Sequence, residues 1–93
     1  QGTWELKFIE WMDINQMTFK CHKDSIQYVD KNNIIRNYYP DFFVDKWNCY
    51  VDIKSSYWYS KQIEKWECLR EQVKDVEIRV LMENELKKLG IKI

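Results

Sequence analysis

Two aspartates and a lysine stand in segments of this chain whose other residues are typical of buried strands. Asp41 follows the only proline in "YYPDFFV", and Asp52 comes eleven positions later in "CYVDIK", two residues before Lys54. Buried carboxylates near each other are unfavourable unless a cation neutralises them, and such oxygen ligands suit hard divalent ions such as Mg²⁺. A lysine beside such an ion can orient an attacking water and offset charge that develops on a phosphate. These residue types therefore indicate a metal site.

A third carboxylate, Glu5, occupies an unexpected position in the first segment with helical periodicity. That segment, "WELKFIEWMD", follows Thr3, which we expect to be its N-cap. At about 100° per residue, Glu5 falls within the apolar arc formed by Phe8, Ile9 and Met12. We therefore expect Glu5 to face the core or a cleft beside it. An acid that interacts with the positive N-terminal end of the helix dipole is an alternative explanation.

Strands and helices alternate along the rest of the chain. Alternating polarity predicts strands in "MTFKCH", "SIQYVD" and "CYVDIK", and "VEIRVL" is expected to be the last strand. The turn segments "DKNN" and "DKWN" flank "IIRNYYPDFFV". A helix is expected in "SKQIEKWECLREQV", capped by Ser60, and a short one in "ENELKKLG", closed by Gly90. The order helix, three or four strands, helix, strand, helix predicts a small α/β domain with a mixed sheet.

The period of two in "CYVDIK" divides its side chains between two faces of the expected sheet. The core face carries Cys49, Val51 and Ile53, whereas Asp52 and Lys54 share the other face. Asp52 and Lys54 are therefore expected to be neighbours in space. In the following helix, the expected buried stripe consists of Ile63, Trp66, Leu69 and Val73.

Composition limits the classes of function that are open to this chain. Its 93 residues, 45% of them hydrophobic, are expected to form a single domain, residues 1–93, with one core. Fifteen basic and fifteen acidic side chains cancel, which argues against binding of a polyanion through net charge. No apolar run is long enough to cross a membrane, so no membrane partner is expected. Because residue 1 is Gln rather than Met, we expect a fragment or catalytic domain of a longer chain.

The three cysteines do not follow the spacing of a known framework. Their odd number and irregular positions favour a reducing, intracellular setting, expected to be the cytoplasm of a host cell. A zinc site made of Cys21, His22, Cys49 and Cys68 would be conceivable, but the sequence contains no C-x-x-C pair. We therefore expect buried thiols and one surface histidine.

The motif around the aspartates resembles that of the PD-(D/E)xK nuclease superfamily. "PDFFV" and, after it, "DIK" carry the likeness, and Glu5 lies where these enzymes often have an acid on the first helix. The segments "YYPDF", "YVDIKS" and "LREQVKDVEIRVL" are similar to phage endonuclease I type Holliday-junction resolvases. Phage homing endonucleases and the cleaving subunit of Tn7-like transposases are also similar. The resemblance, from Glu5 to about Leu81, implies a restriction-endonuclease-like core: a small mixed sheet flanked by helices in α-β-β-β-α-β order, plus a short C-terminal helix.

The resemblance also implies a role for each residue of the motif. Asp41, Asp52 and the backbone carbonyl of Ile53 would ligate Mg²⁺ or Mn²⁺. Lys54 would orient the attacking water, and Glu5 would complete the acidic cluster directly or through a water. Relatives often have Glu in place of Asp52, and Gly directly after the lysine where this chain has a serine. Neither difference removes a group that the chemistry requires.

Residues that follow Lys54 are candidates for contacts with DNA. By resemblance, Lys65 lies where relatives carry a basic residue near the phosphate. Lys61 can contact backbone phosphates, and Tyr57 and Trp58 can stack on bases. The alternatives are ordinary solvated charge for the lysines, and packing in the core or in a dimer contact for the aromatic residues.

The expected function is that of a metal-dependent DNA endonuclease of phage or mobile-element type, which hydrolyses phosphodiester bonds. DNA would be its partner and Mg²⁺ or Mn²⁺ its cofactor, with a homodimer and an additional DNA-binding domain outside this chain as further options. The alternative function is a catalytically inactive DNA-binding or protein-interaction module with the same fold. Junctions, specific duplex sites and single strands all suit this core, so the substrate is left open.

Overall fold

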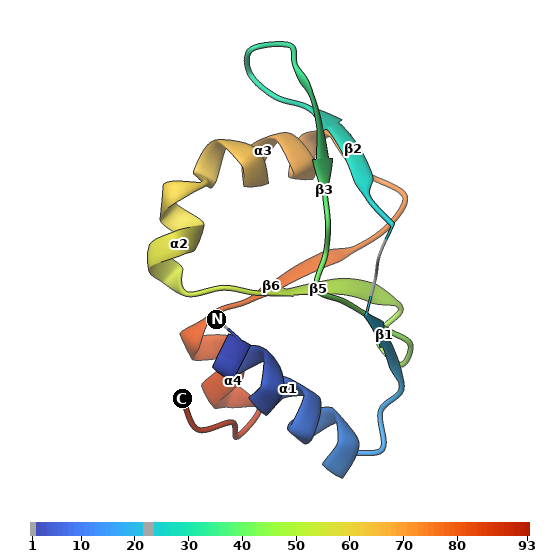
Figure 1. Ribbon diagram of the computed structural model, residues 1–93, viewed down its shortest axis with the longest axis vertical. Helices are drawn as coiled ribbons and strands as arrows, with labels where there is room; N and C mark the ends of the chain where they lie inside the picture. The colour runs from blue at the N-terminus through green and yellow to red at the C-terminus, as the bar shows by residue number, and fades with distance from the viewer. Residues whose placement is uncertain (1, 22–23) are drawn as a thin grey trace.

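The computed structural model describes residues 2–21 and 24–93 (Figure 1). The helices are α1 (Gly2–Ile14), α2 (Ser56–Lys61), α3 (Ile63–Gln72) and α4 (Glu83–Lys88). The strands are β1 (Phe19–Cys21), β2 (Ile26–Val29), β3 (Ile35–Tyr38), β4 (Phe42–Val44), β5 (Cys49–Ile53) and β6 (Ile78–Leu81). Within these described ranges, no helix combines the length and the apolar composition that a bilayer crossing requires.

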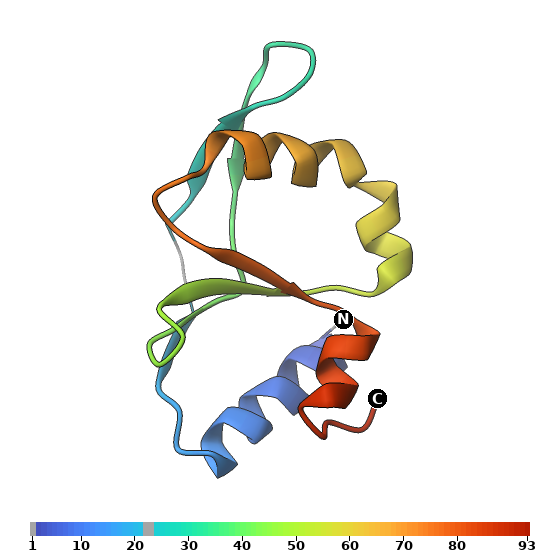
Figure 2. The same ribbon diagram turned by 180° about the vertical axis from the view of Figure 1, so that it is seen from behind.

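Four strands form a central mixed sheet in the order β1-β4-β5-β6. β4 pairs antiparallel with both β1 and β5, whereas β5 pairs parallel with β6. β2 and β3 form a separate antiparallel hairpin. α1 and α4 lie on one face of the sheet, and α2 and α3 lie on the other face together with the hairpin (Figure 1, Figure 2). A small mixed sheet flanked by helices agrees with the α/β class expected from the sequence.

Apolar side chains pack on both faces of the sheet rather than in one core. The larger cluster joins Phe8 and Met12 of α1 to Val51 of β5, all of them fully buried. The second cluster, beneath α3, includes Trp66 and Tyr38. Burial of one such side chain stabilises the fold by roughly 1.5–3 kcal/mol. The expectation of a single core is therefore wrong, because the sheet separates the residues that α1 buries from those that α3 buries.

Turn residues close both hairpins where the sequence predicts turns. In the "DKWN" turn, Asn48 has a φ of 50° and its N–H donates to the carbonyl of Asp45 at 3.1 Å. In the "DKNN" turn, the carboxylate of Asp30 accepts the N–H of Asn32 at 2.8 Å. Asn tolerates the left-handed region better than most residues, which explains its use at such positions. Gly90, with a φ of 87°, follows α4 as predicted.

The predicted N-caps of two helices are wrong. α1 begins at Gly2, so Thr3 lies inside the helix rather than at its cap. The helix that was expected to start after Ser60 begins earlier, because Ser55 is the N-cap of α2 and its hydroxyl accepts the N–H of Trp58 at 3.3 Å. An aromatic run directly before the predicted start concealed this earlier cap.

A break at Gln62 divides the predicted helix into α2 and α3. Gln62 has φ and ψ of −120° and 29°, outside the helical range, and the chain changes direction there (Figure 1). Ile63, the first residue of α3, is therefore 44% exposed instead of buried. Trp66 and Leu69 are buried as predicted, but Val73, just beyond α3, is only half-buried. The predicted stripe is correct at its centre and wrong at its N-terminal end.

The cysteines occupy three different environments. Cys49 and Cys68 are buried as expected, but Cys21 is exposed. Cys21 ends β1, an edge strand of the sheet, where a side chain has fewer neighbours. Cys49 and Cys68 belong to the clusters on opposite faces of the sheet, so they do not share a metal ion. His22 lies outside the described residues.

Candidate active site

The hairpin formed by β4 and β5 brings Asp41 and Asp52 together. Phe42 lies opposite Val51 in the antiparallel register, so the next pair along the hairpin is Asp41 and Asp52. Directly opposite residues project from the same face of a sheet, and neighbouring residues project from opposite faces. Because Val51 packs in the cluster beneath α1, both carboxylates lie on the other face, toward α3. The spacing between the two aspartates thus corresponds to one hairpin.

The two carboxylates interact directly. The carboxylate of Asp52 lies close to that of Asp41, and Asp41 Oδ2 accepts the backbone N–H of Ile53 at 2.9 Å. Asp52 is only 3% exposed. Burial, followed by the proximity and the negative charge of Asp41, raises the pKa of Asp52 to about 8. The folded chain therefore favours the protonated form of Asp52 up to about that pH.

The pairing of β5 with β6 positions Lys54. Its backbone N–H donates to the carbonyl of Leu81 at 3.1 Å, which continues the parallel ladder one residue beyond β5. Its side chain is half-buried, and its positive charge opposes the rise in the pKa of Asp52. The structure therefore brings Lys54 and Asp52 to the same site.

Glu5 reaches this site from α1. It is half-buried and lies one helical turn before Phe8. Burial raises the pKa of Glu5, the charge of Asp41 adds to this rise, and Lys54 opposes it. These effects place Glu5 within electrostatic range of both residues. Glu5 also lies in the first turn of α1, where the helix dipole favours an acid, so the two explanations of its position are compatible.

Lys65 approaches the carboxylates from α3. Its ammonium lies 5.0 Å from the centre of the Tyr38 ring and 4.9 Å from the centre of the Trp66 ring. Burial lowers the pKa of Lys65, and the positive charge of Lys54 lowers it further, whereas Asp52 raises it. Two lysines on different elements thus act on the same pair of acids.

Tyr38 belongs to the site although no sequence pattern singled it out. It is 2% exposed, and its ring packs edge-on against Trp66 with 5.5 Å between the ring centres. Burial, followed by the charge of Asp52, raises the pKa of its hydroxyl. Within the described residues, this hydroxyl has no partner in full hydrogen-bond geometry. Its position in the aromatic run before Pro40 gave no periodic signal.

α2 presents aromatic and cationic side chains directly after the site. Tyr57 is 59% exposed and Trp58 is 53% exposed, and their rings meet edge-to-face at 5.3 Å. The ammonium of Lys61 lies 5.2 Å from the centre of the Tyr57 ring. The start of this helix is held by Glu83, whose carboxylate accepts the N–H of Ser56 at 2.8 Å and its hydroxyl at 3.1 Å. α2 begins two residues after Lys54, so these side chains follow the candidate site directly in the chain.

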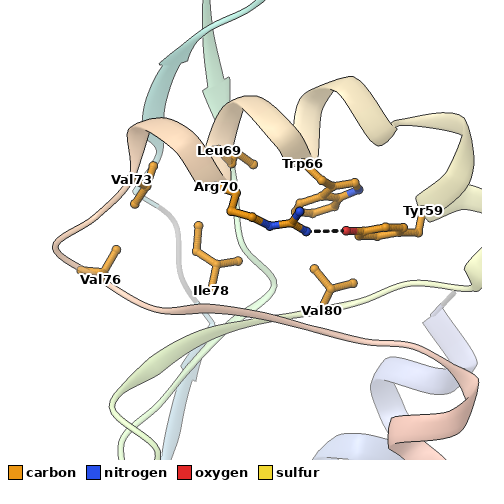
Figure 3. Close-up of a pocket in the computed structure, with 8 residues that line it drawn as sticks. All are labelled: Tyr59, Trp66, Leu69, Arg70, Val73, Val76, Ile78 and Val80. Atoms are coloured by element: carbon orange, nitrogen blue, oxygen red, sulfur yellow. Dashed lines mark hydrogen bonds between the residues drawn. The ribbon is translucent and has the colours of Figure 1, made fainter.

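A pocket of about 160 Å³ opens between α3 and β6 (Figure 3). Most of its lining is apolar, and Arg70 donates to the hydroxyl of Tyr59 at 3.1 Å. Tyr59 stacks on Trp66 with 5.5 Å between the ring centres. Val80, which lines the pocket, is the register partner of Asp52, so the pocket and the carboxylates lie on the same face of the sheet. The acids and lysines of the candidate site do not line this pocket.

The donor chemistry of the site fits a hard divalent cation. In the part of the chain that the structure describes, no three His, Cys, Asp or Glu side chains are assembled as a metal-binding group. Asp41 and Asp52 nevertheless place two carboxylates close together, and a cation would offset the repulsion that raises the pKa of Asp52. The carbonyl of Ile53 is a further oxygen donor next to Asp52. Glu5 adds a third carboxylate within electrostatic range of Asp41.

The site thus combines acids from α1 and from the β4–β5 hairpin with two lysines. Lys54 follows β5, and Lys65 lies on α3. Comparisons of the chain with protein-family models, with curated proteins and with solved structures find no match. The motif and the geometry of these side chains are therefore the grounds on which a function is proposed.

Proposed function

We propose that this chain is a metal-dependent endonuclease that hydrolyses phosphodiester bonds in DNA. The observation that carries the proposal is the buried Asp52, whose carboxylate lies close to the half-buried Asp41 and has Lys54 beside it. A carboxylate that serves only the fold is usually left in solvent or paired with a cation, because a buried acid without one is costly. Acids with strongly raised pKa values, grouped with lysines, are typical of functional sites.

The order of the elements supports a restriction-endonuclease-like core. Without the β2–β3 hairpin, and with α2 and α3 counted as the two parts of one broken helix, the chain runs α1, β1, β4, β5, α2–α3 and β6, with α4 at the end. This is the α-β-β-β-α-β order that the resemblance to PD-(D/E)xK nucleases implies. The motif residues also lie on the expected elements, since Glu5 is on the first helix and both aspartates are on the central hairpin. The hairpin of β2 and β3 is an insertion into this order.

Asp41 and Asp52 would hold the cation, together with the carbonyl of Ile53 and with Glu5 directly or through a water. Mg²⁺ prefers oxygen ligands and keeps several of its own waters, and Mn²⁺ accepts the same donors. The bound ion would supply Lewis-acid activation at the phosphate. Because ligating carboxylates must be deprotonated, ion binding would release the proton of Asp52, and affinity would rise with pH through the pKa of Asp52.

Lys54 would orient the attacking water, and Lys65 would face the phosphate. Lys65 is fixed above two aromatic rings, which restricts a side chain that is otherwise flexible. The two ammonium groups repel each other, since the charge of Lys54 lowers the pKa of Lys65. A phosphate bound between them would relieve this repulsion, and the two charges would stabilise the negative charge that develops on it.

The exposed side chains of α2 would contact the DNA strand that enters the site. Tyr57 and Trp58 offer aromatic surface to bases, and Lys61 offers a positive charge to the backbone. Stacking of a base on an aromatic side chain is worth about 1–3 kcal/mol. A chain with no net charge can bind DNA in this way because the contacts are local.

Cleavage of a supercoiled plasmid and of a labelled four-way junction tests the proposal. Each substrate is incubated with Mg²⁺, Mn²⁺ or EDTA, using wild type, Asp41→Asn and Lys54→Ala. The matched controls are Asp75→Asn and Lys88→Ala, which change exposed residues of the same types. We expect metal-dependent cutting in wild type and in both controls, its loss in Asp41→Asn, and much slower cutting in Lys54→Ala.

The preferred DNA distinguishes a junction resolvase from a duplex endonuclease. DNA binding without cutting under any metal would support the alternative, a catalytically inactive module with the same fold. Two results together would refute the nuclease proposal. The wild type would cut no DNA, and it would bind no divalent ion more tightly than Asp41→Asn does.

A further inference from the structure

The β2–β3 hairpin projects from the body of the protein, and its two outer edges differ (Figure 1, Figure 2). The outer edge of β2 is held by α3: the N–H of Val29 donates to Gln72 Oε1 at 2.8 Å, and the carbonyl of Val29 accepts from Gln72 Nε2 at 2.7 Å. Lys31 also pairs with Glu67 of α3 at 3.8 Å. α3 therefore occupies one edge of the hairpin.

The contacts of Val29 determine which groups of β3 point outward. Both polar backbone groups of Val29 bind Gln72, so Val29 and its register partner Ile35 form a pair without backbone hydrogen bonds between them. Such pairs alternate with hydrogen-bonded pairs along an antiparallel ladder. Arg36 therefore bonds across to β2, whereas the N–H and C=O of Ile35 and Asn37 point away from β2. Among the described residues, these outward groups have no hydrogen-bond partner.

On one face of the hairpin, the side chains next to this edge are apolar or uncharged. Ile35 is 66% exposed, Tyr39 is 61% exposed, and Val29, opposite Ile35, is 40% exposed. Gln27 and Asn37 complete this face of the hairpin, which carries no charge. Natural proteins usually protect an exposed strand edge with charged residues or proline. The one charged residue of β3, Arg36, lies on the opposite face of the hairpin, where it pairs with Asp30 at 2.8 Å. Such an edge is a template for pairing with another strand.

We propose that the outer edge of β3 pairs with the same edge of a second copy of this chain. An antiparallel pair across a twofold axis at Asn37 would set the two Asn37 residues opposite each other. Ile35 of each copy would then face Tyr39 of the other, because the two positions are equally distant from Asn37. The edge is thus complementary to itself, as a twofold interface requires. The two hairpins would form one continuous antiparallel sheet, with the apolar side chains of both copies on a single face.

The small size of this contact determines how strong the dimer is. β3 has four residues, and a stable interface between proteins buries roughly 1,200–2,000 Å². A single pair of such strands buries less than this area, so the dimer forms and dissociates with concentration. Edge pairing also leaves the acids and lysines of the active site free, because they belong to the central sheet, α1 and α3.

Sedimentation equilibrium of the full chain over a wide range of concentrations tests the proposal, and it does not depend on nuclease activity. The average mass is expected to rise from 11.6 kDa toward twice that value. Asn37→Pro removes the outward N–H at the centre of the interface and the side-chain oxygen that accepts from Ser25 Oγ at 3.3 Å, but no backbone hydrogen bond inside the hairpin, so it should keep the protein monomeric. Gln27→Pro is the matched control, because Gln27 lies opposite Asn37 and its N–H points to the other outer edge.

A dimer in Gln27→Pro together with a monomer in Asn37→Pro supports the proposal, provided that both variants keep the near-ultraviolet circular dichroism of wild type. A second variant, Ile35→Lys, should also weaken the dimer, because it places two positive charges at the contact. The proposal is overturned if wild type stays monomeric at every concentration, or if Asn37→Pro self-associates as strongly as wild type.

Discussion

Replacement of Asp52 by Asn should change how the stability of the protein depends on pH. Burial and the contact with Asp41 raise the pKa of Asp52 from 3.8 to about 8 in the folded chain. Below about pH 4, folded and unfolded chains both hold the proton, and the site costs nothing. Between about pH 4 and about pH 8, the unfolded chain releases this proton while the folded chain keeps it, so the free energy of unfolding falls as the pH rises. Above about pH 8 both states are ionised, and the loss levels off.

The size of this loss of unfolding free energy follows from the number of pH units between the pKa of Asp52 in the unfolded chain and its pKa in the folded chain. Each pH unit between the two pKa values costs about 1.4 kcal/mol of unfolding free energy. From about pH 5 to about pH 8, wild type should therefore lose up to about 4 kcal/mol relative to Asp52→Asn, whose side chain does not titrate. Urea unfolding of both proteins in EDTA, at several pH values, measures this difference. Addition of Mg²⁺ at about pH 8 should restore stability to wild type and not to the variant.

A comparison of wild type with Asp52→Asn, each measured as unfolding free energy against pH, separates the contribution of Asp52 from that of other groups that titrate. The pKa of Glu5 is also raised, so both proteins should share the small additional slope that Glu5 produces. Asp75→Asn, an exposed control, should follow the wild-type profile. Parallel profiles for wild type and Asp52→Asn would refute the raised pKa of Asp52, and with it the main electrostatic argument for a cation site.

Three further outcomes are expected. Lys54→Ala should slow cleavage by about 10²–10³-fold while calorimetry still detects Mg²⁺ binding, because Lys54 acts on the reaction and not as a ligand. Trp58→Ala should weaken DNA binding by about 1–3 kcal/mol in fluorescence anisotropy, whereas Val76→Ala, also exposed, should leave it unchanged. Phe8→Ala should lower the free energy of unfolding by about 3–5 kcal/mol in urea, because Phe8 is fully buried against the sheet.

The sequence predicted the central hairpin well because its signals are local. The alternation in "CYVDIK" placed Val51 and Ile53 in the core, and the "DKWN" turn lies where the polar residues indicated it. The burial of Asp52 could not be read from the alternation, since a period of two says which face a residue occupies and not what covers that face. α3 and Tyr38 cover it, and both depend on contacts between distant segments.

Other features were missed because they depend on tertiary contacts. The stretch from Ile34 to Val44 is divided between two sheets, and Pro40, which has no N–H to donate, lies at the division. β2 pairs with β3 rather than with the central sheet, and its outer edge contacts Gln72, which is far away in sequence. Lys65 was predicted from the family resemblance alone, because nothing in its helix distinguishes it from a solvated lysine.

The antiparallel register of β4 and β5 limits how this part of the chain can change in length. Residues added at the tip, in the turn between Val44 and Cys49, would leave Phe42 opposite Val51 and the two aspartates in contact. A residue added within β5 would shift its side chains by one position and turn Asp52 toward α1, into an apolar cluster that has no room for a charge. Insertions and deletions are therefore tolerated at the turn and excluded from the strands. The count of residues between the two acids is free to vary, whereas the alternation within each strand is not.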